Sequence, residues 1–101
     1  MPLKAILMGE RGDERKYLPM PPASHLHLPE PNDESFRCAG FIDIYGHAVF
    51  NWLQMPTLMS EILQLESEQS DEGARYFLRE LYKLAEECRD GIHLYLKVMG
   101  D

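Results

Sequence analysis

The chain has 101 residues, which is enough for a single domain, spanning residues 1–101, with one modest hydrophobic core. Its apolar fraction of 45% and aromatic fraction of 10% exclude wholesale disorder, although the net charge is −7. That charge repels nucleic acid and anionic membrane surfaces, and it favours basic proteins as partners.

The chain start and the cysteines indicate the compartment. The apolar run before Gly9 is too short for a signal peptide, and no window approaches the ~20 apolar residues of a membrane span. We therefore expect a cytoplasmic protein whose two cysteines are reduced.

The first 35 residues divide into a strand and a long loop. Residues 3–9 predict an interior strand, because both of its faces are mostly apolar. Residues 10–35 hold five of the seven prolines and many charges, which favours an extended Pro-rich loop. We expect residues 17–18 and 26–28 to hold this loop against the body of the protein.

A hairpin is predicted next. Residues 36–42 read as a second strand, residues 43–47 as a tight turn, and a third strand runs from His47 to about Gln54. The amides of Asn51 and Gln54 interrupt this apolar stretch. They either tie down loop backbone, which we favour, or mark a polar pocket.

Two helices and a final strand complete the chain. Pro56 suits the first turn of a helix that continues to Leu65, and Ser70 is the expected N-cap of a second helix that stops at Gly91. Residues 92–99 alternate as a strand. The second helix carries one apolar stripe, namely Ala74, Phe77, Leu78, Leu81, Leu84, Ala85 and Cys88.

This order of elements predicts an α+β fold, in which a four-stranded antiparallel or mixed sheet carries both helices packed on one face. Because the strands nearest the chain ends could lie unpaired at the sheet edges, homodimerisation through an edge is a further expectation.

The residues do not indicate a metal, a cofactor or a catalytic nucleophile. Zinc ligands usually come in tight pairs such as CxxC or HxxxH, and none is present. Cys38 and Cys88 fall on predicted core faces, where a thiol behaves as a small apolar group. We therefore expect a protein that is not an enzyme.

One cluster at the hairpin supports an alternative interpretation, a small enzyme or ligand-binding domain under a lid made by the Pro-rich loop. An Asp at a hairpin corner more often closes the turn, which weighs against this alternative. The cluster consists of Asp43, Tyr45, His47 and Asn51.

Two motifs suggest a family. Residues 43–55 read D-x-Y-G-x-x-V-F-N-x-x-Q-M, and residues 95–101 read Y-L-K-x-x-G-D. Together they resemble the pattern of a group of small uncharacterised bacterial proteins, although that pattern often has Pro where this chain has Ile44. The resemblance leaves out the Pro-rich loop. By analogy, it implies an immunity or antidote partner of a bacterial toxin.

The favoured interpretation is a small acidic protein that binds a basic protein, such as a toxin domain, and occludes its active site. Residues 52–101 carry ten acidic residues against five basic ones, so we place the binding face there. The predicted partner-binding residues are the aromatic anchors Tyr45, Trp52 and Tyr76 and the carboxylates Glu66, Glu68, Asp71, Glu72, Glu86, Glu87 and Asp90.

Overall fold

A computed structural model describes residues 3–21, 24–29, 34, 36–42, 46–91 and 93–100. Its strands are β1 (Lys4–Met8), β2 (Glu14–Pro19), β3 (His47–Asn51) and β4 (Tyr95–Met99). Its α-helices are α1 (Met55–Glu68) and α2 (Glu72–Asp90), and two short 3-10 turns are η1 (Ala39–Phe41) and η2 (Trp52–Gln54).

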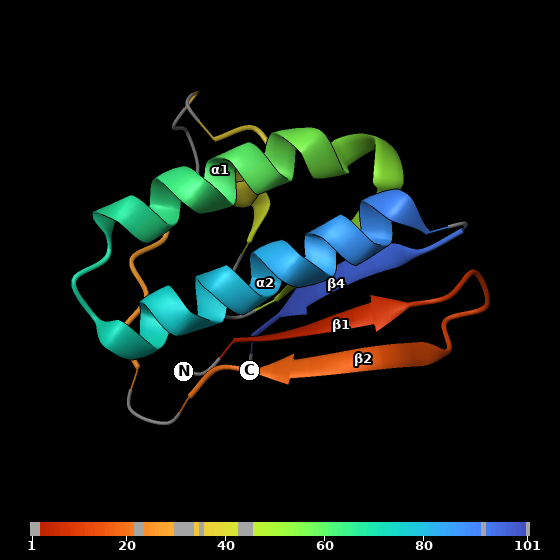
Figure 1. The fold of residues 1–101 in the computed structure, drawn as a ribbon, viewed down its shortest axis with the longest axis horizontal. Helices are drawn as coiled ribbons and strands as arrows, with labels where there is room; N and C mark the ends of the chain where they lie inside the picture. Colours follow the sequence, from red (N-terminus) through yellow and green to blue (C-terminus); the bar gives the residue numbers. More distant parts are fainter. Residues whose placement is uncertain are drawn as a thin grey trace.

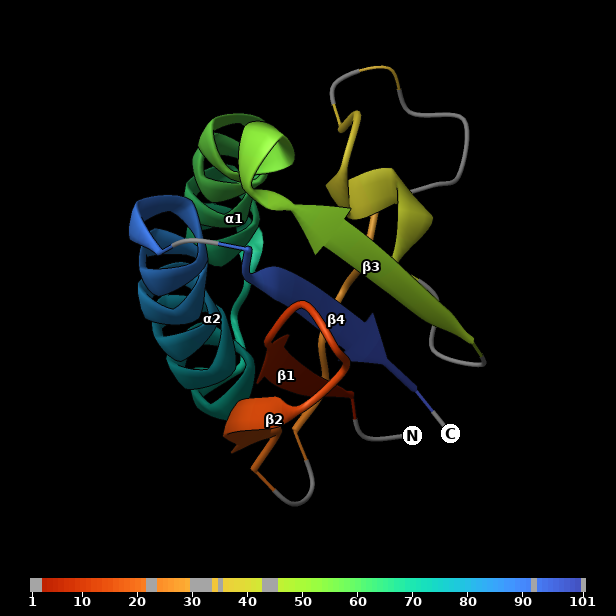
Figure 2. The ribbon, with the colours of Figure 1, turned by 90° about the vertical axis from the view of Figure 1, so that its right-hand side faces the viewer.

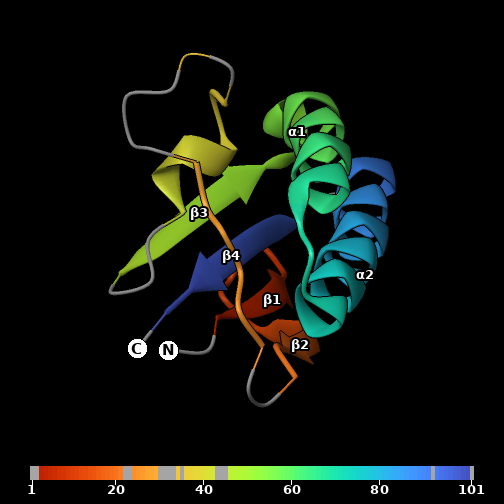
Figure 3. The same cartoon turned by 90° about the vertical axis from the view of Figure 1, so that its left-hand side faces the viewer.

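The predicted α+β architecture is confirmed (Figure 1). The strands form one four-stranded sheet in the order β2-β1-β4-β3. Every neighbouring pair is antiparallel, which decides between the two predicted sheet types. Figures 2 and 3 show both helices on the same side of the sheet.

The strands nearest the chain ends occupy the centre of this sheet. β1 pairs with both β2 and β4, as expected for an interior strand, and β4 pairs with both β1 and β3. The premise of edge pairing by terminal strands is therefore wrong, because the edges belong to β2 and β3.

β2 corrects the prediction of a loop over residues 10–35. Residues 14–19 pair with β1 through a turn in which Gly12 has a φ of +83°, a value that favours glycine. The sequence does not indicate this strand, because five of its six residues are exposed and no apolar alternation results. Charged side chains and the terminal Pro19 are typical of an edge that resists further pairing.

The predicted strand over residues 36–42 is wrong. The segment makes the single turn η1, and the buried residues Phe36, Cys38, Ala39 and Ile42 do not alternate. Phe41, which a strand would place on the face of Ala39, is 71% exposed. The predicted turn lies partly outside the described residues, at 43–45. β3 begins at His47 as predicted but ends at Asn51.

The helices follow their predicted patterns. Pro56 lies in the first turn of α1, and all seven residues of the predicted apolar stripe of α2 are buried. The N-cap of α2 is Asp71 rather than Ser70, and its carboxylate accepts the Ala74 N–H at 2.9 Å. Gly91 follows the last turn with extended backbone, where a side chain would collide with Leu94.

The core lies between the sheet and the helices. Register places Leu7, Leu96 and Phe50 in one row across the sheet, and all three are buried. The long β2–β3 connection closes the core with Met20, Leu26, Leu28 and the buried residues before β3. Leu18 also packs on the core, whereas Tyr17 is exposed, so only part of the predicted loop contact is confirmed.

Candidate protein-binding surface

A buried carboxylate fastens the η1 segment to α1. Glu61 is 6% exposed, and its two oxygens accept the backbone N–H groups of Arg37 at 2.6 Å, Cys38 at 2.9 Å and Ala39 at 2.8 Å. These three bonds satisfy amides at the start of the turn that would otherwise lack partners. Glu61 therefore has a structural role, which sequence reasoning missed. The sequence did contain an indication of this role, because Glu61 lies between Leu58 and Ile62 on the apolar face of the predicted helix.

A second buried polar side chain fastens the earlier part of the connection. The Gln69 amide, just beyond α1, accepts the His27 N–H at 2.9 Å and donates to the His27 carbonyl at 2.9 Å. It also donates to the Leu65 carbonyl at 3.1 Å. The side chain thus pairs with the loop much as a neighbouring strand would, and both of its N–H donors are used within the protein.

The amides of Asn51 and Gln54 tie down backbone, as favoured from sequence. Asn51 Oδ1 accepts the N–H groups of Leu53 and Gln54, while Gln54 Oε1 accepts the Asn51 N–H at 2.9 Å. This reciprocal capping box fixes η2 between β3 and α1.

The described members of the predicted hairpin cluster do not converge. Asp43 and Tyr45 lie outside the described residues. His47 and Asn51 stand at opposite ends of β3, about 13 Å apart for four residues of strand. Within the described ranges, no three His, Cys, Asp or Glu side chains gather closely enough to hold a metal ion.

Both thiols are free and buried. Burial raises the pKa of the Cys88 thiol to about 11, and Cys88 Sγ donates to the Leu94 carbonyl at 3.5 Å. Burial and the Glu61 carboxylate raise the pKa of the Cys38 thiol. Neither cysteine is therefore a thiolate near neutral pH, consistent with core packing.

The seven predicted carboxylates divide between the two ends of α2. This helix has 19 residues and is about 28 Å long. One group lies at the α1–α2 connection, namely Glu66, Glu68, Asp71 and Glu72. The other group lies in the last two turns of α2, namely Glu86, Glu87 and Asp90. A single contact patch cannot be centred on both groups.

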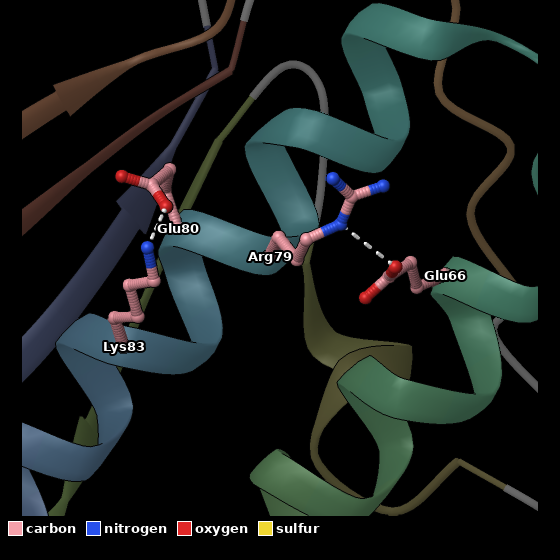
Figure 4. Close-up of polar contacts among 4 residues, drawn as sticks. All are labelled: Glu66, Arg79, Glu80 and Lys83. Atoms are coloured by element: carbon pink, nitrogen blue, oxygen red, sulfur yellow. Dashed lines mark hydrogen bonds and ion pairs between the residues drawn. The ribbon is translucent and has the colours of Figure 1, made fainter.

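Two of the four carboxylates at the α1–α2 connection are engaged within the protein. Arg79 reaches from α2 to Glu66 near the end of α1, with 3.0 Å between Nε and Oε2 (Figure 4). Asp71 caps α2, and the hydrogen bond from the Ala74 amide lowers the pKa of its carboxyl group. Glu68 and Glu72 are exposed.

The group at the end of α2 borders a groove of about 660 Å³ between this helix and the β1–β2 hairpin. Lys16 of β2 contacts Glu87 across it, with 2.7 Å between Nζ and Oε1. Asp90 pairs with Arg89, whose hydrogen bond lowers the pKa of the Asp90 carboxyl group. The residues lining the groove are Leu7, Arg15, Lys16, Lys83, Glu86, Glu87, Asp90, Gly91 and Leu94.

An exposed apolar pair lies at this same end. Register pairs Asn51 with Tyr95, the first residue of β4, so Trp52 and Leu53 begin η2 where α2 ends and β4 begins. Trp52 is 52% exposed and Leu53 is 66% exposed. Tyr76 is 51% exposed but lies one turn into α2, near the other end. Tyr45, the third predicted anchor, lies outside the described residues.

Among the described residues, no helix has both the length and the apolar character needed to cross a membrane. Comparisons of the chain with protein-family models, curated proteins and solved structures gave no match in any of the three.

Proposed function

We propose that this chain is a small protein-binding protein that docks on a basic partner through the end where α2 stops and η2 begins. We call this surface the η2–α2 end and define it by Trp52, Leu53, Glu86, Glu87 and Asp90. The partner class we propose is a bacterial toxin, which the chain inactivates as an immunity or antidote protein by covering its active site.

The proposal rests on two exposed apolar side chains that lie at the same end of α2 as three carboxylates. Trp52 and Leu53 follow one another in a turn that the Asn51–Gln54 capping box holds rigid. A Trp on a fixed backbone loses less conformational entropy on binding than one in a mobile loop, and Trp is among the residues most enriched at energetic centres of interfaces. The carboxylates at the same end of α2 suit Lys and Arg side chains on the partner.

Charge and apolar contact would have different roles in this mechanism. Residues 55–91 contain nine acidic and four basic residues, so the helical layer has a net charge of −5. Such a field mainly accelerates association with a basic protein, and salt weakens it. The apolar pair then sets the lifetime of the complex, because apolar contacts are little affected by salt.

A direct test uses the whole chain as bait in extracts of its natural host, at low and at high salt. We expect a basic protein that is retained at low salt and reduced at high salt. The captured protein is then purified, and its own activity is assayed with increasing amounts of the chain. The proposal predicts loss of that activity at one equivalent.

Variants distinguish specific docking from charge attraction. Trp52→Ala should weaken the purified complex at least tenfold, whereas the double variant Glu68→Gln/Glu72→Gln, at the opposite end of α2, should weaken it far less, through slower association alone. A captured partner that keeps full activity when saturated with the chain would refute the immunity mechanism. Equal effects of the two variants would refute the assigned surface.

A further inference from the structure

The face of the sheet opposite the helices forms a second surface that the proposed function does not use. Among the described elements, Figures 2 and 3 show no helix or strand over this side. Because residues directly opposite in an antiparallel ladder share a face, the register identifies the residues on it. The central row contains Tyr17, Ile6, Lys97 and Val49 from β2, β1, β4 and β3.

The rows on either side extend the same mixture of side chains. One contains Pro19, Lys4, Met99 and His47, and the other contains Glu14, Met8, Tyr95 and Asn51. Apolar and aromatic side chains therefore make up half or more of the face. Its charged groups are two lysines and one glutamate. An overall acidic protein thus has one face on which formal positive charge exceeds negative charge.

The face is hollowed between its two lysines. A depression of about 390 Å³ is lined by Lys4, Ile6, Glu14, Tyr17, Lys97 and Met99. Ile6 is only 8% exposed, whereas Tyr17 beside it is 57% exposed. The hollow thus offers an apolar base, an aromatic wall, two ammonium groups and the Glu14 carboxylate. Its formal charge remains positive, which suits an apolar side chain with a carboxylate close by.

We propose that this open face docks an acidic amphipathic helix of a partner protein. Three strand spacings of ~4.8 Å give the face a width of about 14 Å, close to the ~10–12 Å diameter of one helix. An apolar stripe on that helix would fill the hollow, and Glu or Asp beside the stripe would pair with Lys4 and Lys97. The carboxylates of α1 and α2 lie behind the sheet, roughly one Debye length of ~10 Å or more away, so their repulsion is screened.

The charges disfavour the other classes of occupant. A second copy packed face to face would bring four lysines together with only two glutamates. Nucleic acid could stack on Tyr17 and Tyr95, but the two lysines of the face offer few phosphate contacts for a polyanion. Both alternatives are distinguishable outcomes of the test.

The test is an NMR titration of the full chain with a synthetic helical peptide of about 18 residues, five turns long, with a Leu stripe flanked by Glu. The matched control peptide has Lys in place of each Glu. We expect the Glu peptide to shift the amides of Ile6, Tyr17, Val49 and Lys97, and to bind at least tenfold more tightly than the Lys peptide.

Two charge-reversal variants complete the test, each first shown to keep the wild-type amide spectrum. Lys97→Glu should weaken the Glu peptide at least tenfold, and Arg79→Glu, on α2, should not. If Lys97→Glu perturbs the spectrum, Lys4→Glu replaces it with the same expected loss. The proposal would be overturned by amide shifts confined to the helices, or by tighter binding of the Lys peptide or of a single-stranded oligonucleotide than of the Glu peptide. It would also be overturned if the wild-type chain dimerises and Lys97→Glu abolishes the dimer.

Discussion

Glu61 on α1 and Cys38 before η1 are joined across 23 residues of sequence, because Glu61 Oε1 accepts the Cys38 N–H at 2.9 Å. The same carboxylate accepts two further amides of this segment. A charge that is almost fully buried thus replaces the strand pairing that the sequence suggested for residues 36–42. It also helps to position η1 beside β3 and α1.

Removing this carboxylate should destabilise the whole domain. Glu61→Leu leaves three backbone N–H groups without an acceptor, and we expect a loss of roughly 3 kcal/mol or more in the free energy of unfolding. Glu61→Gln keeps one acceptor oxygen and should lose less. Urea unfolding measures both variants, with Gln64→Leu, on the exposed side of α1, as a control within about 0.5 kcal/mol of wild type. A wild-type midpoint for Glu61→Leu would show that the contacts carry no stability.

The Gln69 amide should govern the order of the loop around His27. Gln69→Glu retains an acceptor for the His27 N–H, but it cannot donate to the His27 and Leu65 carbonyls. We expect a loss of about 2 kcal/mol, since one buried and one partly buried carbonyl lose their donor. Amide hydrogen exchange of His27 reports the local effect and should accelerate more than exchange in β4. If hydrogen exchange accelerated equally at the His27 amide and in β4, a local role of the Gln69 amide would be contradicted.

The buried Cys88 thiol predicts a loss of stability in alkali. Its pKa is about 11 in the folded protein, above its ordinary value, so from about pH 9 upward the unfolded chain releases a proton that the folded chain retains. The free energy of unfolding should then fall by up to ~1.4 kcal/mol per pH unit from this group. The Cys88→Ala variant is less stable at pH 7, but its stability should decline less steeply between pH 9 and pH 11. If the free energy of unfolding fell equally steeply with pH in the wild type and in Cys88→Ala, the Cys88 thiol would be excluded as the cause of the alkaline instability.

His93 has left-handed backbone, with a φ of 56°, in the connection from α2 to β4. A β-branched side chain is strongly disfavoured there, so His93→Val should destabilise the protein by about 1–2 kcal/mol. His93→Gly removes the steric conflict and should match or exceed wild-type stability. Thermal unfolding of the two variants checks this order, and a Val variant as stable as the Gly variant would contradict it.

The sequence predicted those elements whose burial has one clear period. The stripe of α2 and the alternation of β4 each face one core, so their patterns follow directly from helix and strand geometry. The predicted strand over residues 92–99 is nevertheless too long, because β4 begins at Tyr95 and His93 has left-handed backbone. β2 gave no such signal, because an edge strand with one buried neighbour does not need alternating apolar residues. The prediction of a strand over residues 36–42 failed because η1 is a single turn, which buries Ala39 and Ile42 at a spacing of three rather than two.

The proposed binding surface was only partly predictable. Charge counts located acidic residues along both helices, but they could not tell which carboxylates the fold itself uses. Only the arrangement in space joins Glu66 to Arg79 and Glu87 to Lys16. The strand register, likewise, is what brings Trp52 to the end of α2.

Two equally exposed aromatic residues at opposite ends of α2 allow a direct comparison that tests docking through the η2–α2 end. The measurement is the dissociation constant of the purified complex for Trp52→Ala and for Tyr76→Ala, each against wild type. We predict at least tenfold weaker binding for Trp52→Ala and an unchanged dissociation constant for Tyr76→Ala. An unchanged dissociation constant for Trp52→Ala, or an equal loss for both variants, would contradict docking at this surface.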